Sequence, residues 1–350
     1  MSDRKHAFLV VGIIFPIIAA VSVLLRFKAR RLARQKLQTD DWLALSALVL
    51  SCGFTVTVLI DSRMGNLGGH LTFDEDGYPI IGDDDTWYTI FSLTNYAMQV
   101  IWNPTVGVTK LSIAFLYKRI FATYAFRMLT WGTIVMLAAW TIAFTLVNIF
   151  PCYPISNAWT TESTDGCVNF PAMYTAAVAS NVATDIIVML IPIYNVWNLH
   201  MPMRRKLGVV SIFCLGSFVI VTGIIRLVLL VRAYAALEDP VFMDITYDFS
   251  PPILWTVVEI NLGVTCACLP LMRPVWRAAR DSPVMTKLLK SFTGSYASMD
   301  KSDEAELGII SGDSGKSKDG IPTSSTPSSA PDPVRAFAFK PNGGFGGGFR

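Results

Sequence analysis

The sequence predicts an all-α membrane protein with seven transmembrane helices, its N-terminus outside and its C-terminus in the cytoplasm. Two observations on composition support this class: 52% of the 350 residues are hydrophobic and 16% are charged, a balance too apolar for an ordinary soluble domain. A third observation gives the number of helices. The chain contains seven mostly apolar runs, each close to the roughly twenty residues that cross a bilayer.

Polar loops separate the seven runs, and each run is read as one span. The first run begins near Ala7 without a small-residue cleavage site before a polar mature region, so we interpret it as a span and not as a signal peptide. We therefore expect a short extracellular N-terminus at residues 1–6 and a seven-helix domain over residues 7–272. The expected spans are residues 7–25, 41–60, 87–116, 128–150, 172–198, 207–232 and 251–272.

Charge alternates between successive loops, and this alternation predicts the orientation. Basic residues in short loops stay in the cytoplasm, so the first, third and fifth loops lie inside and the acidic even-numbered loops lie outside. Arg4 and Lys5 oppose this orientation but are outnumbered by the later loops. The basic residues are Arg26, Lys28, Arg30, Arg31, Arg34 and Lys36, then Lys118, Arg119 and Arg127, then Arg204, Arg205 and Lys206, and finally Arg273, Arg277 and Arg280 in the tail. The acidic residues are Asp74, Glu75, Asp76 and Asp83 to Asp85, then Glu162 and Asp165, and finally Glu238, Asp239, Asp244 and Asp248.

The six cysteines fall into two groups. Cys152 and Cys167 lie fifteen positions apart in the fourth loop, which the charge pattern places in an oxidising compartment. We expect a disulfide between them, stabilising the fold by about 3 kcal/mol through loop closure; the alternative is two free thiols. The others lie inside spans, where a thiol behaves as a small apolar side chain: Cys52, Cys214, Cys266 and Cys268.

The C-terminal region changes composition after the last span. Residues 273–290 mix Trp276, Leu288 and Leu289 with basic residues, which is typical of an interfacial helix, although Pro283 interrupts it. Residues 291–350 are rich in Ser, Gly, Pro, Asp and Lys, too polar to pack, and are predicted to form a disordered cytoplasmic tail. Its Ser and Thr residues are either phosphorylation sites that regulate the protein or parts of a solvated tail without a function.

The third span carries a polar stripe. At 100° per residue, Asn95, Gln99, Asn103 and Lys110 fall within an arc of about 80°, so they are expected to face the bundle interior. There they line a ligand cavity or form an interhelical hydrogen-bond network. Pro104 within the stripe is expected to kink the helix. For Lys110 an alternative is that its stem snorkels toward the nearby cytoplasmic surface.

Three further ionisable residues lie inside spans. Asp185 shares a helix face with Asn181, while Arg226 and Glu259 lie at a common depth in the sixth and seventh spans. A charge in hydrocarbon costs a few kcal/mol unless it is paired. We therefore expect an Arg226–Glu259 ion pair, with Asp185 sharing the same arginine. These charges form a ligand site or a switch with rearranging pairs; the alternative is a fixed structural lock.

Several function classes are disfavoured. His6 and His70 belong outside and His200 inside, so the three histidines cannot converge on one zinc ion. No phosphate-binding or dinucleotide loop follows a predicted strand, and a formal charge of +3 is no footprint for nucleic acid. We expect no catalytic residues, no metal site and no nucleic-acid partner.

A set of motifs occurs in one order along the chain. They are Asp40-Asp41-Trp42, the sequence GNLGGH at residues 65–70, LSIAFLYKRIF at residues 111–121, Cys152-Tyr153-Pro154 with Trp159 and Cys167, residues 181–226, and residues 255–270 with Glu259. From about Arg26 to Trp276, this order resembles the fungal rhodopsin-domain membrane proteins. The resemblance implies a rhodopsin-like seven-helix domain over residues 7–272 and a receptor-like role. Some relatives carry an extracellular Cys-rich CFEM domain; six residues precede the first helix here, so we expect the functions of that domain to be absent.

The resemblance does not imply retinal. Rhodopsins hold their chromophore through a lysine of the seventh helix, but residues 250–272 contain none, and Lys110 is the only lysine in a span. Our hypothesis is a receptor or sensor in the plasma membrane that couples an unknown extracellular ligand to a cytoplasmic signalling partner. The alternatives are a carrier or channel with a polar intramembrane path, and a membrane scaffold.

Overall fold

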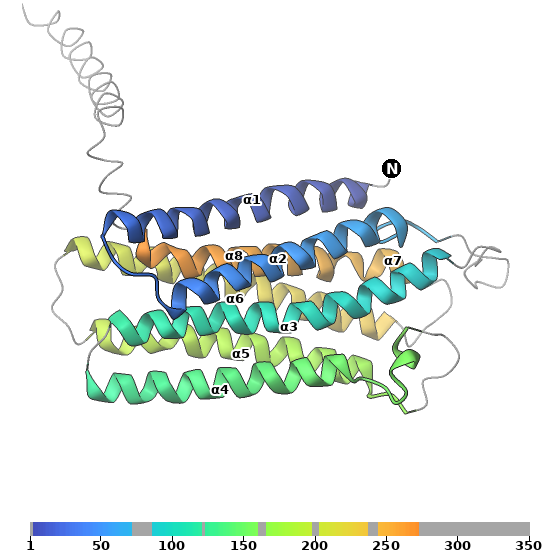
Figure 1. Cartoon of the computed structure of the whole chain (residues 1–350). Coiled ribbons are helices and arrows are strands. Elements are labelled where there is room, and N and C mark those ends of the chain that lie inside the picture. Colours follow the sequence, from blue (N-terminus) through green and yellow to red (C-terminus); the bar gives the residue numbers. More distant parts are fainter. Residues whose placement is uncertain are drawn as a thin grey trace, which may run out of the picture. The chain divides into compact units, whose positions relative to one another are not determined.

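The computed structural model describes residues 3–71, 86–120, 123–159, 166–197, 203–236 and 244–272, all within the first of two units, Met1–Lys287. These residues form seven long helices, short connecting elements and no β-strand (Figure 1). The predicted all-helical class is confirmed. The long helices are α1 (Asp3–Leu32), α2 (Thr39–Met64), α3 (Thr86–Ile120), α4 (Tyr124–Ile149), α5 (Phe170–Trp197), α6 (Met203–Ala236) and α8 (Ser250–Cys268); the short elements are η1 (Ile155–Ala158), α7 (Ile245–Asp248) and η2 (Leu269–Leu271).

Some sequence predictions lie outside the described residues. They are the acidic residues of the second loop, Glu162, Asp165, Glu238 and Asp239, the interfacial helix predicted at residues 273–290, and the tail at residues 291–350. The domain boundaries after the last helix therefore stay predictions.

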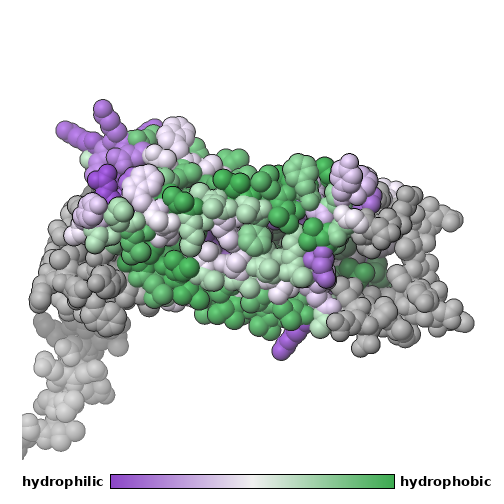
Figure 2. Space-filling model, turned by 90° about the horizontal axis from the view of Figure 1, so that it is seen from below, coloured by the Kyte–Doolittle hydropathy of each residue, from purple (hydrophilic) through white to green (hydrophobic). Residues whose placement is uncertain are grey.

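Six of the long helices are long and apolar enough to cross a membrane, namely α1, α2, α4, α5, α6 and α8. The exception is α3, whose apolar sequence is interrupted by the polar stripe that begins at Asn95. The protein is an integral, multi-pass membrane protein. Hydrophobic side chains cover the middle of the face shown in Figure 2, and exposed apolar side chains of this belt occur on several helices, where they can face lipid tails. On α1 this belt includes Ile13, Ile17 and Leu24, and on α4 it includes Val135 and Ile142.

The helices extend beyond the predicted spans, which corrects the positions of several basic residues. We placed residues 26–31 in the first loop, but α1 continues to Leu32. The predicted basic loop at Arg204 to Lys206 lies in the first turn of α6. A helix of 30 residues such as α1 is about 45 Å long, whereas the hydrocarbon layer is about 30 Å thick. The helix is therefore long enough to carry its terminal basic residues beyond the hydrocarbon layer.

The helix α8 lies inside the bundle, where it packs against α1, α2, α3 and α6. It is the most enclosed of the six apolar helices, with 67% of its apolar stretch buried against 22–39% in the other five. Figure 1 shows α8 below α1 and passing behind α2, with α3 running beside α2. The residues of α8 and α3 consequently face the interior, where polar side chains must find partners.

The interior also contains threonines and a close helix crossing. The hydroxyls of Thr55, Thr105 and Thr109 donate to backbone carbonyls four residues earlier, at 2.6–2.9 Å, which satisfies them within their own helices. At Gly107 on α3, a β-carbon would lie 2.1 Å from Thr141 Oγ1 on α4. A side chain at this position would force α3 and α4 apart.

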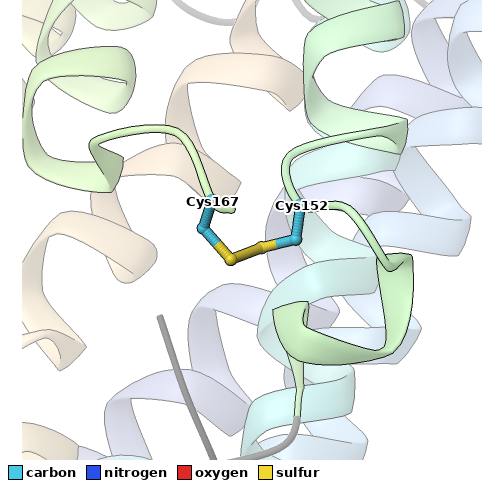
Figure 3. The surroundings of a disulfide bond; sticks show 2 residues. All are labelled: Cys152 and Cys167. Atoms are coloured by element: carbon cyan, nitrogen blue, oxygen red, sulfur yellow. A yellow bond between two sulfur atoms is a disulfide. The ribbon is translucent and has the colours of Figure 1, made fainter. Parts of the chain in front are cut away.

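The disulfide predicted between Cys152 and Cys167 is confirmed (Figure 3). It joins the segment after α4 to the segment before α5, and two backbone hydrogen bonds flank it: Tyr153 N donates to Gly166 O at 3.0 Å, and Val168 N to Pro151 O at 2.9 Å. The bridge therefore belongs to a small folded cap at this end of α4 and α5. We call it the disulfide end of the bundle.

A second cap at the disulfide end is formed by residues 65–71 after α2. This segment packs on residues 244–250: Gly68 N donates to Thr246 O at 3.0 Å, and Thr246 Oγ1 donates to Gly69 O at 2.8 Å. The His70 ring lies 2.9 Å from a carboxylate oxygen of Asp244 and stacks on Tyr247 with 4.0 Å between ring centroids. The motif GNLGGH therefore ties the end of α2 to α7, the short helix that precedes α8.

Candidate functional site

The candidate site is a group of buried polar side chains in the bundle interior, formed by Lys110, Asn181, Asp185, Arg226 and Glu259. We call it the central network. Its members come from four helices: Lys110 from α3, Asn181 and Asp185 from α5, Arg226 from α6 and Glu259 from α8. The four charged side chains are between 3% and 15% exposed. Two positive and two negative groups balance, which is the condition under which charges are tolerated in a protein interior.

The four charges form two ion pairs. Lys110 Nζ lies 3.2 Å from Asp185 Oδ1, and Arg226 Nε lies 2.8 Å from Glu259 Oε2. The structure thus brings Arg226 and Glu259 together as expected. The expectation that Asp185 shares Arg226 is wrong, because Lys110 is the partner of Asp185. The depth of a residue along its helix follows from the sequence, but the rotation of α3 and α5 toward each other does not.

Asn181 connects the two pairs. Lys110 Nζ donates to the backbone oxygen of Asn181, to Asn181 Oδ1 and to Thr184 Oγ1, each at 2.7 Å. The side-chain amide of Asn181 donates in turn to Glu259 Oε1 at 2.7 Å. Three short bonds use the three N–H groups of the ammonium, so Lys110 points into the bundle. The alternative that its stem snorkels to the surface is wrong.

Arg226 retains unused hydrogen-bonding capacity. Its guanidinium lies over the ring of Trp102, 4.4 Å from the centroid. Its contact with Glu259 is close but lacks the alignment of a hydrogen bond, and among the described residues Arg226 Nη2, Trp102 Nε1 and Asn103 Oδ1 have no hydrogen-bond partner. A buried polar atom without a partner costs about 1–3 kcal/mol. These three atoms are therefore the unused hydrogen-bonding groups beside the central network.

The polar stripe of α3 divides into two parts. Asn103 and Lys110 are buried, while Asn95 and Gln99 are half-buried. Asn95 donates to Phe91 O of its own helix at 2.8 Å, and Asn103 Nδ2 reaches Thr141 O on α4 at 3.4 Å. Asn103 and Lys110 thus take part in contacts between helices, whereas the side chain of Asn95 is satisfied within its own helix. The helix continues through Pro104.

Sequence reasoning missed a second buried group, formed by Arg26 and Arg30 of α1 with Asp40 and Asp41 of α2. We call it the α1–α2 charge cluster. Arg26 binds Asp40 at 2.8 Å and Asp41 at 2.9 Å, and Arg30 binds the same carboxylates at 2.6 and 2.9 Å. The four side chains are at most 3% exposed. From the sequence alone, Arg26 and Arg30 indicate only the orientation of the chain.

The cluster also holds α3 and α8. Arg26 Nη1 donates to Ala267 O near the end of α8 at 2.8 Å, and Ser112 Oγ of α3 donates to Asp40 O at 2.8 Å. The sequence did contain a signal for it. Two arginines four residues apart lie on one helix face, and two adjacent aspartates open the next span. Two positive and two negative side chains at one end of a helix hairpin favour ion pairs between them over contact with water.

Comparison with known proteins gives one family. A family model described as the fungal rhodopsin domain matches residues 25–278 of this chain. This range contains both the central network and the α1–α2 charge cluster. The match therefore covers the part of the chain on which the candidate site is built.

Individual relatives are more distant. The polyenoic acids biosynthesis gene cluster protein Ba17b of Metarhizium anisopliae is 28% identical over 276 residues, which cover 75% of this chain and 71% of that protein. A SAT4 family membrane protein of Emericella nidulans is 37% identical over 187 residues, covering 52% of this chain and 45% of that protein. Receptor GIN3 of Arthrobotrys oligospora is 22% identical over 316 residues, covering 87% of this chain and 69% of that protein.

Proposed function

The chain belongs to the fungal rhodopsin domain family, and from this premise we propose that it is a seven-helix membrane receptor or sensor. It couples an extracellular ligand to a cytoplasmic partner and resides in the plasma membrane. The observation that carries the proposal is the central network, in which two buried ion pairs on four helices are linked through Asn181. The relative named Receptor GIN3, which aligns with 87% of this chain, is consistent with it.

The proposal includes seven spans, with α3 as the seventh. This helix has 35 residues, more than the roughly twenty needed to cross a bilayer. It packs against α2, α4, α5 and α8, so neighbouring helices shield its polar stripe from lipid. A polar helix enclosed by apolar ones satisfies the requirement that ionisable groups face the bundle interior.

The proposed orientation places the disulfide end outside. The basic residues of α1, α3 and α6 gather at the opposite end, where the charge rule places the cytoplasm. Arg4 and Lys5, which oppose this rule, are engaged by the protein itself. Arg4 donates to Tyr247 O and its guanidinium lies 3.3 Å from the Tyr247 ring centroid, and Lys5 donates to Asn66 at 2.7 Å.

The network has the properties of a switch. Arg226 can form hydrogen bonds to a ligand through Nη2, and doing so weakens its hold on Glu259. Because Glu259 also accepts from Asn181, which accepts from Lys110, a change at Arg226 reaches α3, α5 and α8. Such a set of pairs with alternative partners is a two-state element that a ligand can bias.

A carrier or channel is the second candidate function, and a membrane scaffold is the third. A transport path requires polar groups that exchange partners with a passing solute. Lys110, however, is held by three protein acceptors at 2.7 Å, which favours the switch. We further propose that the protein is no enzyme and binds no retinal, since α8 contains no lysine and the same contacts occupy Lys110. Retinal binding is checked by adding all-trans-retinal and measuring visible absorption.

The functional test compares Arg226→Lys with Arg232→Lys in the full chain. Lysine keeps the positive charge but lacks the guanidinium fork, and Arg232 is an exposed arginine on the same helix. Crosslinking in intact cells followed by mass spectrometry should capture a cytoplasmic protein whose recovery changes with Arg226→Lys and not with Arg232→Lys. Equal recovery of that protein with the wild type and with both variants contradicts the proposal. Solute or proton flux in liposomes that is lost in Lys110→Ala supports the carrier instead.

A further inference from the structure

A charged cavity of about 800 Å³ lies at the end of the bundle opposite the disulfide end, where α1 and α3 end in basic residues. It is formed where α2 begins, α3 ends and α4 begins, and it is separate from the central network. The lining residues that matter here are Asp40, Trp42, Lys118, Arg119 and Arg127. We call it the basic groove. Its volume falls within the roughly 300–1,000 Å³ typical of small-molecule sites.

The groove favours an anion. Its described lining contains three cationic side chains, those of Lys118, Arg119 and Arg127, and one carboxylate, that of Asp40. This carboxylate is already bound by Arg26 at 2.8 Å and Arg30 at 2.6 Å. Its charge is therefore compensated from within the α1–α2 charge cluster, and the three lining cations remain to attract a ligand.

Arg119 supplies a prepared hydrogen-bond donor. Its Nη2 donates to Gln35 Oε1 at 2.7 Å, which fixes the guanidinium, while its Nη1 is buried and has no hydrogen-bond partner among the described residues. Lys118 is also held in place, because its ammonium lies 3.8 Å from the ring centroid of Trp131. A fixed guanidinium with an unused N–H and a nearby ammonium is the arrangement that binds phosphate oxygens.

The position of the groove favours a ligand that is part of the membrane. Trp42 in the lining is 58% exposed, and Trp131, which contacts Lys118, is 41% exposed; exposed tryptophans gather at the level of lipid headgroups. In the proposed orientation the groove opens toward the cytoplasmic leaflet, which is rich in anionic lipid.

We propose that the basic groove binds the headgroup of an anionic phospholipid through a phosphate monoester, as carried by phosphoinositides. Arg119 and Lys118 contact the phosphate oxygens, Arg127 adds a charge at the mouth, and Trp42 lies beside the glycerol region. The inference rests on the proposed orientation and is independent of the receptor activity. The anionic lipid would then be a structural or regulatory ligand of the cytoplasmic end.

The test uses the full chain in nanodiscs and two variants with equal loss of charge. One is Lys118→Gln with Arg127→Gln in the groove. The other is Arg31→Gln with Lys36→Gln, both exposed residues at the same end that do not line the groove. Binding of phosphatidylinositol 4,5-bisphosphate over phosphatidylcholine is measured by native mass spectrometry. We expect the groove variant to lose at least about tenfold in affinity and the control variant to bind nearly as the wild type does.

Three results overturn the proposal. The first is equal binding of the two lipids by the wild type, and the second is equal loss in both variants, which would indicate a diffuse charge effect. The third comes from competition. Soluble inositol 1,4,5-trisphosphate should displace the lipid, and inorganic phosphate at the same concentration should not; displacement by inorganic phosphate assigns the groove to free phosphate. Because none of these readouts involves signalling, the proposed receptor function stands or falls separately.

Discussion

The side-chain amide of Asn181 on α5 donates to Glu259 Oε1 on α8 at 2.7 Å. On its other side Asn181 accepts two bonds from Lys110, so a single neutral residue joins both ion pairs of the central network. The pairs therefore do not act as independent locks. Substitutions at Asn181 test the connection without altering any charge.

The first prediction is that Asn181→Leu destabilises the protein although it removes no charged group. Leucine has a similar volume but leaves Lys110 without one acceptor and Glu259 without one donor, and each hydrogen bond to a charged group contributes about 1.5–3 kcal/mol. We expect the thermal midpoint in detergent to fall. In a double-mutant cycle, the coupling between Lys110→Met and Glu259→Gln should also shrink when Asn181 is leucine. Unchanged coupling contradicts the bridging role.

The second prediction concerns Arg226 and Glu259. Removing one member of a buried ion pair costs about 3–5 kcal/mol because its partner remains charged and unpaired. Arg226→Ala and Glu259→Ala should each strongly reduce folded protein, and replacing both residues with apolar side chains of similar volume should restore part of the loss. The matched comparison is Asp185. Its coupling to Arg226 should be smaller than that of Glu259, because Lys110 is its direct partner; a larger coupling contradicts the pairing seen here.

The third prediction separates buried from exposed basic residues on α1. Arg26 is fully buried against Asp40 and Asp41, whereas Lys28, two positions away, is exposed. Arg26→Ala should cost about 3–5 kcal/mol, while Lys28→Ala should change little. Expression and thermal stability of the two variants give the comparison. If the two variants lose equal stability, the basic residues act through the net charge at this end of α1 and not through the α1–α2 charge cluster.

The fourth prediction is that Cys152→Ser and Cys167→Ser destabilise the protein to the same extent and that the double variant is no worse. Each single change breaks the same bond, which closes a loop whose constraint is worth about 3 kcal/mol. Surface abundance and thermal stability are the measurements. Losses that add in the double variant would mean that the two thiols contribute separately.

The fifth prediction tests the orientation. A tag at Gly77, in the second loop, should be accessible to an impermeant label on intact cells, and a tag at Met203, at the start of α6, should be protected until the membrane is opened. Positive residues near the ends of spans are the physical cause. The reverse labelling pattern excludes the proposed orientation, and with it the position of the basic groove at the cytoplasmic leaflet.

The sequence was sufficient for those features that follow from one helix at a time. The helical class, the disulfide, and the need for Lys110, Asp185, Arg226 and Glu259 to face inward all follow from local composition, because an unpaired charge cannot remain in lipid. Pairing was harder. Which cation meets Asp185 depends on the rotation of α5 relative to α3, and neither depth nor periodicity determines a rotation between helices.

Two other features needed the folded chain for a different reason. Arg26 and Arg30 carry the same composition signal whether they are solvated markers of orientation or buried partners of Asp40 and Asp41. The motif at residues 65–70 packs on residues 244–247, far away in the sequence. Contacts over such a separation leave no periodic trace in either segment, so the motif could be noted but not explained.

The contacts of α1 give the bundle a mechanical asymmetry. At one end Arg26 holds α1 to α2 and to α8, and at the other end Arg4 holds it to Tyr247 and Ser250. Helices α1 and α8 are therefore joined to each other near both of their ends. By contrast, the ion pair described between α6 and α8 is a single one, Arg226–Glu259, near the middle. We therefore expect that a rotation of α6 about that pair would leave the contacts of Arg4 and Arg26 intact, because neither is made to a described residue of α6.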